Sequence, residues 1–98
     1  MAIGLIATIT VQEGKTEEFE RIFLELIDQV RANEPGNVFY ALHRSKTEAN
    51  VYKGLEQYNG PAARAEHSKS AHCRAANEKL PGLVAAAPEL AISDGVRY

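Results

Sequence analysis

The first stretch of the chain, residues 2–11, alternates in a pattern that predicts a β-strand. One face of this strand carries Ile3, Leu5, Ala7, Ile9 and Val11. The other face carries Gly4, Ile6, Thr8 and Thr10. The second set is only mildly polar, and a strand that is apolar on both faces needs cover on both sides. We therefore expect this strand to lie inside a sheet whose two faces are both covered.

The apolar positions then change to the period of a helix. Thr16 is the expected N-cap, and Glu17 and Glu18 are well placed against the helix dipole. Residues spaced by three or four follow, namely Phe19, Ile22, Phe23, Leu26, Ile27 and Val30. This spacing predicts an amphipathic helix that ends near Asn33, because the Glu-Pro-Gly-Asn sequence of residues 34–37 combines a helix breaker with a turn.

The rest of the chain reads as a hairpin, a broken helix and a last strand. Residues 38–44 and Val51–Tyr58 are rich in aromatic and β-branched side chains, and the polar residues 45–50 join them. Pro61 opens a helix that runs to about His67, and Ser70 caps a second stretch. The apolar stripe of that stretch is Cys73, Ala76, Leu80 and Val84, with a break at Pro81 and Gly82. Residues 90–98 form the final strand, in which Gly95 marks a bulge.

This order, β-α-β-β-α-β, predicts one α+β domain over residues 1–98 with the ferredoxin-like fold. Right-handed crossovers place the helices on one face of a four-stranded antiparallel sheet. The other face would then be bare and partly apolar, which is unusual in a monomer. We expect a second copy to cover it, so that the protein is a homodimer.

Composition narrows the class of partner. The net charge is −2 and the basic residues are scattered, which argues against nucleic acid. No apolar run approaches the ~20 residues of a membrane span, and the start of the chain lacks the basic region of a signal peptide. A single cysteine, Cys73, forms no internal disulfide, so we expect a cytoplasmic protein.

Side chains able to do chemistry gather between residues 40 and 72. Strand alternation places Tyr52, Gly54, Glu56 and Tyr58 on one face, and Tyr40, Leu42 and Arg44 on one face of the neighbouring strand. His67 and His72 follow on the broken helix. Together these groups predict a partly polar pocket suited to acid–base work.

Simpler interpretations remain open for each of them. His67 would cap carbonyls at a helix end, His72 would be a packing or surface residue, and Glu56 would be a solvated strand residue. Cys73 reads as a buried structural thiol. The spacing of His67, His72 and Cys73 matches no standard zinc pattern, so we expect no metal site. Phosphate-loop and dinucleotide motifs are absent from the sequence, and we expect no organic cofactor.

Taken in order, several short motifs resemble the antibiotic biosynthesis monooxygenase family. They are the Glu-Pro-Gly-Asn-Val-x-Tyr-x-Leu of residues 34–42, the Tyr-x-x-Leu-Glu-x-Tyr of residues 52–58, Ala62-Ala63, and the His-x-x-Ser-x-His of residues 67–72. The resemblance implies a dimeric α/β barrel and cofactor-independent oxidation of a small aromatic or quinol-type substrate by dioxygen. Haem breakdown is disfavoured, because the chain has no tryptophan.

The resemblance also implies roles for single residues. His67 would be the base or the orienting group, with Tyr58 and Glu56 as its catalytic partners. Tyr40, Arg44, Tyr52 and His72 would contact the substrate. Two other functions stay open: acid–base isomerisation of a small metabolite, and a non-catalytic dimer that binds a small ligand.

Overall fold

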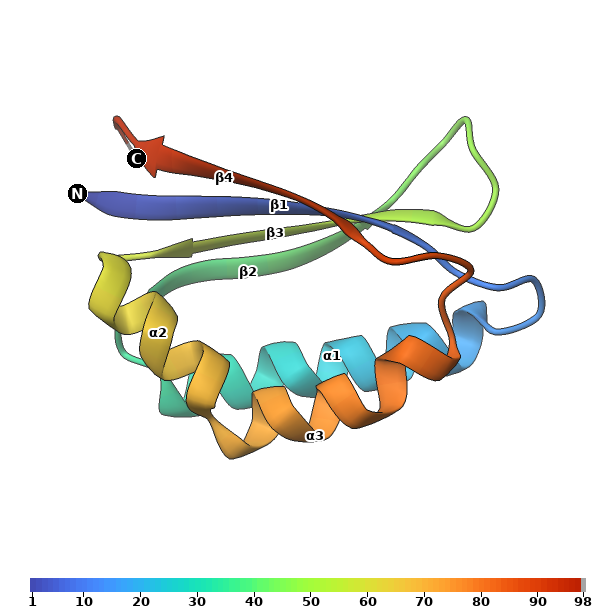
Figure 1. Ribbon diagram of the computed structural model, residues 1–98, viewed down its shortest axis with the longest axis horizontal. Helices are drawn as coiled ribbons and strands as arrows, with labels where there is room; N and C mark the ends of the chain where they lie inside the picture. Colours follow the sequence, from blue (N-terminus) through green and yellow to red (C-terminus); the bar gives the residue numbers. More distant parts are fainter. Residues whose placement is uncertain (98) are drawn as a thin grey trace.

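The computed structural model describes residues 1–97, and it places all helices in one layer against one face of a four-stranded sheet (Figure 1). The strands are β1 (Ala2–Thr10), β2 (Asn37–Arg44), β3 (Val51–Tyr58) and β4 (Glu89–Gly95). The helices are α1 (Thr16–Asn33), α2 (Pro61–Lys69) and α3 (Ala71–Lys79), followed by the 3-10 turn η1 (Leu80–Gly82). The strand order is β2-β3-β1-β4 and every pairing is antiparallel, which confirms the predicted ferredoxin-like fold.

Several predicted element ends were wrong by a few residues. Helix α1 begins at Thr16 itself and Lys15 is its N-cap, so Thr16 is not the cap. Strand β1 ends at Thr10, and Val11 instead forms an isolated bridge with Val84. Strand β4 ends at Gly95, whereas the prediction ran to Tyr98, which lies outside the described residues.

Gly95 was predicted to mark a bulge, and this was also wrong. It pairs in register with Ala2, whereas the irregularity of the sheet lies in β2, between Asn37 and Phe39. A Cβ atom at Gly95 would stand 2.8 Å from the Cβ of Ala2. Glycine is therefore needed here because two strands approach closely.

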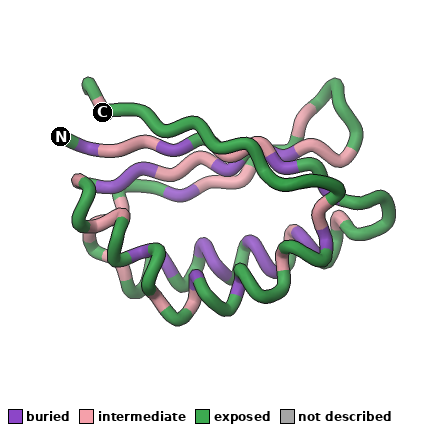
Figure 2. Tube along the Cα trace, viewed as in Figure 1, coloured by how far each residue is buried: buried purple, intermediate pink, exposed green. Residues whose placement is uncertain are grey.

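The core lies between the helices and the sheet. The predicted stripe of α1 is buried throughout, and Phe19 at 0% exposure packs against Tyr52 with their tilted rings 4.9 Å apart between centroids. Figure 2 shows buried positions along the facing sides of α1 and the three strands β1, β2 and β3. Fully burying side chains of this size stabilises the fold by roughly 1.5–3 kcal/mol each.

Two apolar regions remain open to solvent. On the face of the sheet that the helices leave uncovered, Ile6 and Phe39 are nearly half exposed. On the edge strand β4, Leu90 and Ile92 are 51% and 60% exposed, although they pair with Ala7 and Leu5 and so share the helix-covered face. Among residues 1–97, no helix has the length and apolar character needed to cross a bilayer.

Candidate functional site

The predicted polar residues of β2 and β3 meet on the helix-covered face of the sheet. Tyr40 pairs directly with Glu56, so the two side chains lie on the same face. The hydroxyl of Tyr58 donates a hydrogen bond of 2.8 Å to Oε1 of Glu56. Both tyrosines are buried, and only about a tenth of the Glu56 side chain is exposed. A carboxylate held this way is a structural part of a dry site rather than a solvated strand residue.

His67 projects from the last turn of α2 onto this pair. Its Nδ1 lies 2.9 Å from Oε2 of Glu34, and its Nε2 lies 4.0 Å from Oε1 of Glu56. The ring centroid is 5.3 Å from that of Tyr58 and 5.9 Å from that of Tyr40. His67 thus forms a hydrogen bond with the carboxylate of Glu34 and not with a helix-end carbonyl. Its second nitrogen, Nε2, faces the carboxylate of Glu56 on β3.

His72, on the first turn of α3, reaches the same carboxylate from the other side. Its Nε2 is hydrogen-bonded to Oε2 of Glu34. The two histidines converge because Ser70 fixes the junction of their helices: its hydroxyl donates to the carbonyl of His67 at 2.7 Å and accepts from the N–H of Cys73 at 3.2 Å. Ser70 is the N-cap of α3, as predicted.

The surroundings of His67 favour its charged form. Burial acts to lower its pKa, but hydrogen bonds with Cys73 and Glu34 outweigh burial and raise the pKa from 6.5 to about 9. Burial, followed by the charge of Glu56, raises the pKa of both Tyr40 and Tyr58 above their usual value. At neutral pH the site therefore holds an imidazolium beside neutral phenols.

Two predicted substrate contacts lie elsewhere. Tyr52 donates a hydrogen bond to Glu20 of α1, and the Arg44 guanidinium stands 3.3 Å from the same carboxylate. Tyr52 is six positions before Tyr58 on β3, which corresponds to about 20 Å of strand. These two residues form a separate cluster with Glu20, and they remain predictions as substrate contacts.

Glu34 belongs to the site, although the sequence predicts for it only a place in a helix-ending turn. Its two histidine partners become evident only from contacts in space. Cys73 was read as a structural thiol; it is buried, and its sulfur accepts from Nδ2 of Asn77 at 3.6 Å. No sequence pattern of standard spacing links residue 34 with residues 67 and 72.

Within residues 1–97, the group suited to hold a metal ion is Glu34 with His67 and His72, whose ligating atoms lie within 4.8 Å of one another. Two histidines and a glutamate are a known catalytic zinc set. In the present geometry, however, both imidazoles are hydrogen-bonded to the carboxylate. The three side chains are therefore hydrogen-bond partners of one another.

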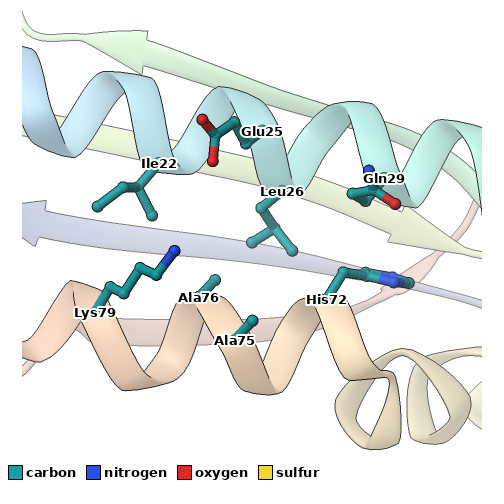
Figure 3. Close-up of a pocket in the computed structure, with 8 residues that line it drawn as sticks. All are labelled: Ile22, Glu25, Leu26, Gln29, His72, Ala75, Ala76 and Lys79. Carbon is teal, nitrogen blue, oxygen red and sulfur yellow. The ribbon is translucent and has the colours of Figure 1, made fainter.

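Two cavities lie along the helices, and the smaller of them reaches the cluster at His72. A groove of about 220 Å3 runs between α1 and α3, with His72 at one end and Lys79 at the other (Figure 3). A larger cavity of about 550 Å3 follows α3 and leads towards β4. Its lining is almost wholly apolar and consists of Asn77, Leu80, Pro81, Val84, Ala85, Ala86, Ala87 and Pro88.

A buried histidine, two carboxylates and two tyrosines between a helical layer and an antiparallel sheet define a small ferredoxin-like protein with a buried cluster of ionisable side chains. The sequence pattern of the antibiotic biosynthesis monooxygenase family matches residues 2–79, and the chain belongs to this family.

Solved structures agree with this assignment. One from Caulobacter crescentus CB15, described as a candidate antibiotic biosynthesis monooxygenase, is 43% identical over 98% of this chain and 91% of that chain, with a TM-score of 0.95. A candidate of the same family from Nitrosomonas europaea, at 22% identity over 97% and 90% of the two chains, shares the fold with a TM-score of 0.92. Rv0793 from Mycobacterium tuberculosis, 17% identical over 100% of this chain and 98% of its own, does so at 0.91. No curated protein matches the sequence.

Proposed function

We propose that this protein is a monooxygenase that oxidises a small aromatic or quinol-type molecule with dioxygen, without a metal or organic cofactor. The observation that carries the proposal is the buried His67, whose Nε2 faces the hydrogen-bonded Glu56–Tyr58 pair at 4.0 Å from the carboxylate. Family membership supports the reaction class. The substrate class rests on the chemistry of the site.

The proposed first step uses two groups of the site. The carboxylate of Glu56 accepts a proton from an acidic phenol or activated C–H group, and the His67 imidazolium stabilises the resulting anion. A pKa of about 9 makes His67 the anion-stabilising group rather than the base at neutral pH. Little solvent reaches the site, which strengthens both interactions.

The reaction balances with substrate and dioxygen alone. For an anthrone-like phenol, loss of a proton gives a carbanion-like anion that passes an electron to dioxygen. The activated carbon loses two hydrogens and gains one oxygen atom as a carbonyl, and the second oxygen atom leaves as water with those hydrogens. All four electrons come from the substrate, so the protein needs no external reductant.

The exposed inner surface of β4 is the substrate surface that we favour. Ile92, Leu5 and Glu56 stand opposite one another in a single row across β4, β1 and β3. With strands ~4.8 Å apart, Ile92 is roughly 10 Å from Glu56. Leu90 extends this surface along β4, and the 550 Å3 cavity, which is within the size range of small-molecule sites, is lined by the segment that leads into β4. A fused-ring aromatic lying along β4 would direct its edge towards Glu56.

The test is dioxygen uptake by protein treated with a chelator, measured with quinols, catechols and anthrone-like phenols. Wild type is compared with His67→Ala, His67→Gln and Glu56→Gln, and with His43→Ala as a matched control, because His43 is an exposed histidine on β2. We expect each site variant to lower kcat by about 10²–10⁴-fold and the control to match wild type. Labelled dioxygen should place one atom in the product and one in water.

Two outcomes would remove the proposal. Equal rates for wild type and both folded His67 variants would exclude His67 from the chemistry. Proton exchange into the substrate without dioxygen uptake would identify an isomerase instead.

We also propose that a second copy of the chain covers the open face of the sheet. A cavity of about 380 Å3 there is bordered by Ile6, Phe39, Leu55 and Gln57. The Nε2 atom of Gln57 is buried and finds no hydrogen-bond partner among the described residues. A buried amide without a partner is destabilising, and an acceptor from a second copy would satisfy it.

Sedimentation at micromolar concentration tests the dimer. Wild type is expected as a dimer, and Ile6→Lys as a species of 10.7 kDa, the mass of one chain. Leu24→Lys is the control, since Leu24 is exposed to a similar degree but lies on α1. A monomeric wild type, or a dimer unaffected by Ile6→Lys, would contradict the proposal.

A further inference from the structure

The environment of Glu34 is unusual for a carboxylate at the end of a helix. Its side chain is only 11% exposed, and it is the acceptor for two imidazoles from two different helices. Hydrogen bonds to a charged acceptor are among the strongest in proteins, and a carboxylate that receives two of them is fixed in orientation. Neither of these bonds joins Glu34 to a strand residue of the site, so it acts through His67.

The backbone of Glu34 is held on both sides. Its N–H donates to the carbonyl of Val30 at 2.9 Å, which ends α1, and its carbonyl accepts from the N–H of Asn37 at 3.1 Å. The following Gly36 carbonyl accepts from Asn59 at 2.8 Å, which ties the turn to the end of β3. The carboxylate is therefore presented by a turn whose backbone is hydrogen-bonded to α1 and to the end of β3.

We propose that Glu34 is a positioning residue, which binds the Nδ1–H of His67 so that Nε2 faces Glu56, and that His72 in turn fixes Glu34. This inference rests on the function proposed above, because it assigns the orientation of that site's histidine. An imidazole whose Nδ1 is occupied by a carboxylate offers only Nε2 for chemistry. Of the three hydrogen-bonded residues Glu34, His67 and His72, only His72 also lines the groove between α1 and α3, so it is the outermost of them (Figure 3).

The geometry distinguishes this role from simple packing. A packing role would be preserved by Glu34→Gln, which has the same shape. An amide, however, can present its N–H to Nδ1, and the ring would then prefer a proton on Nε2. The wrong tautomer in an otherwise intact site is known to reduce kcat by about 10⁴-fold in a histidine–carboxylate pair of another enzyme class.

The experiment uses the full chain and two independent measurements. Nitrogen-resolved NMR of the imidazoles reports which ring atoms of His67 carry protons across a pH titration, and steady-state kinetics report kcat and KM. We expect Glu34→Gln to move the titration of His67 to lower pH and to lower kcat about 10²–10⁴-fold with KM nearly unchanged. His72→Gln should give the same changes to a smaller degree. Glu25→Gln, at an exposed position of α1, should change neither.

The outcomes separate this inference from the proposed function. If no substrate is turned over even by wild type, but Glu34→Gln still changes the protonation of His67, the positioning role stands and the proposed function fails. If wild type is active and folded Glu34→Gln changes neither measurement, the positioning role is overturned. Stoichiometric Co²⁺ binding that removes the Nδ1 proton of His67 in wild type, and that Glu34→Gln abolishes, would overturn it in favour of a metal site.

Discussion

The Nδ1 atom of His67 lies 2.9 Å from the carboxylate of Glu34, although 33 residues separate the two in the chain. The pair joins the end of α1 to the last turn of α2, with the whole β2–β3 hairpin between them in sequence. Because both side chains are largely buried, the pair links the protonation of one imidazole to the stability of the fold.

The first prediction concerns pH. The folded protein binds a proton at His67 more tightly than the unfolded chain, since the pKa is about 9 against 6.5. The resulting stabilisation is complete below pH 6.5, declines as the pH rises, and is lost above about 9. Urea denaturation across this range should show the free energy of unfolding falling with pH.

His67→Gln is the variant that tests this assignment, because it should remove that part of the pH dependence, whereas His43→Gln at an exposed position should retain it. An unchanged slope in His67→Gln would assign the effect to another group. The titratable groups that surround the imidazole are Glu34 at the end of α1, Tyr40 on β2, Glu56 and Tyr58 on β3, and His72 and Cys73 on α3.

A second prediction concerns the turn that presents Glu34. A Cβ atom at Gly36 would stand 2.6 Å from the Cβ of Ala63 on α2, so Gly36→Ala forces the helix that carries His67 away from the turn. We expect a loss of about 1–3 kcal/mol in the free energy of unfolding and a lower kcat. The double variant Gly36→Ala/Ala63→Gly should recover most of both, because it removes the opposing methyl group.

Gly82→Ala serves as the control for this substitution, since no atom lies within 4 Å of its added Cβ. Equal effects at the two glycines, or no recovery in the double variant, would show that the close contact is not the cause.

A third prediction concerns the junction of α2 and α3. Ser70→Ala removes the N-cap of α3 and the hydrogen bond to the carbonyl of His67. The expected loss is about 0.5–2 kcal/mol in chemical denaturation. Ser68→Ala, two residues earlier and exposed, should remain within about 0.5 kcal/mol of wild type. A Ser70 variant as stable as Ser68→Ala would exclude the cap as a stabilising contact.

A fourth prediction concerns the core. Phe19 is fully buried against Tyr52 and Phe23, and Phe19→Ala should reduce the free energy of unfolding by about 3–5 kcal/mol. Leu24→Ala on the outer side of the same helix should change it by no more than about 0.5 kcal/mol. Similar losses in the two variants, read from thermal or urea unfolding, would contradict the assigned orientation of α1.

Local pattern was enough to predict the elements and their order. The stripe from Phe19 to Val30 identifies α1 and its buried side because helical spacing is a property of neighbouring residues. The alternation of Tyr52, Gly54, Glu56 and Tyr58 likewise predicts their common face, on which Tyr52, Gly54 and Tyr58 are buried. Ends of elements, such as the N-cap at Lys15, depend on backbone geometry that these patterns do not specify.

The sequence by itself determined the fold class, the family motifs and the strand faces on which Tyr40, Glu56 and Tyr58 lie. Only the tertiary structure decided that Glu34 joins them and that Tyr52 and Arg44 stand apart with Glu20. The reason is physical. Periodicity orients a side chain within its own element, whereas a contact between elements is decided by strand register and by the turn and cap that set each helix against the sheet.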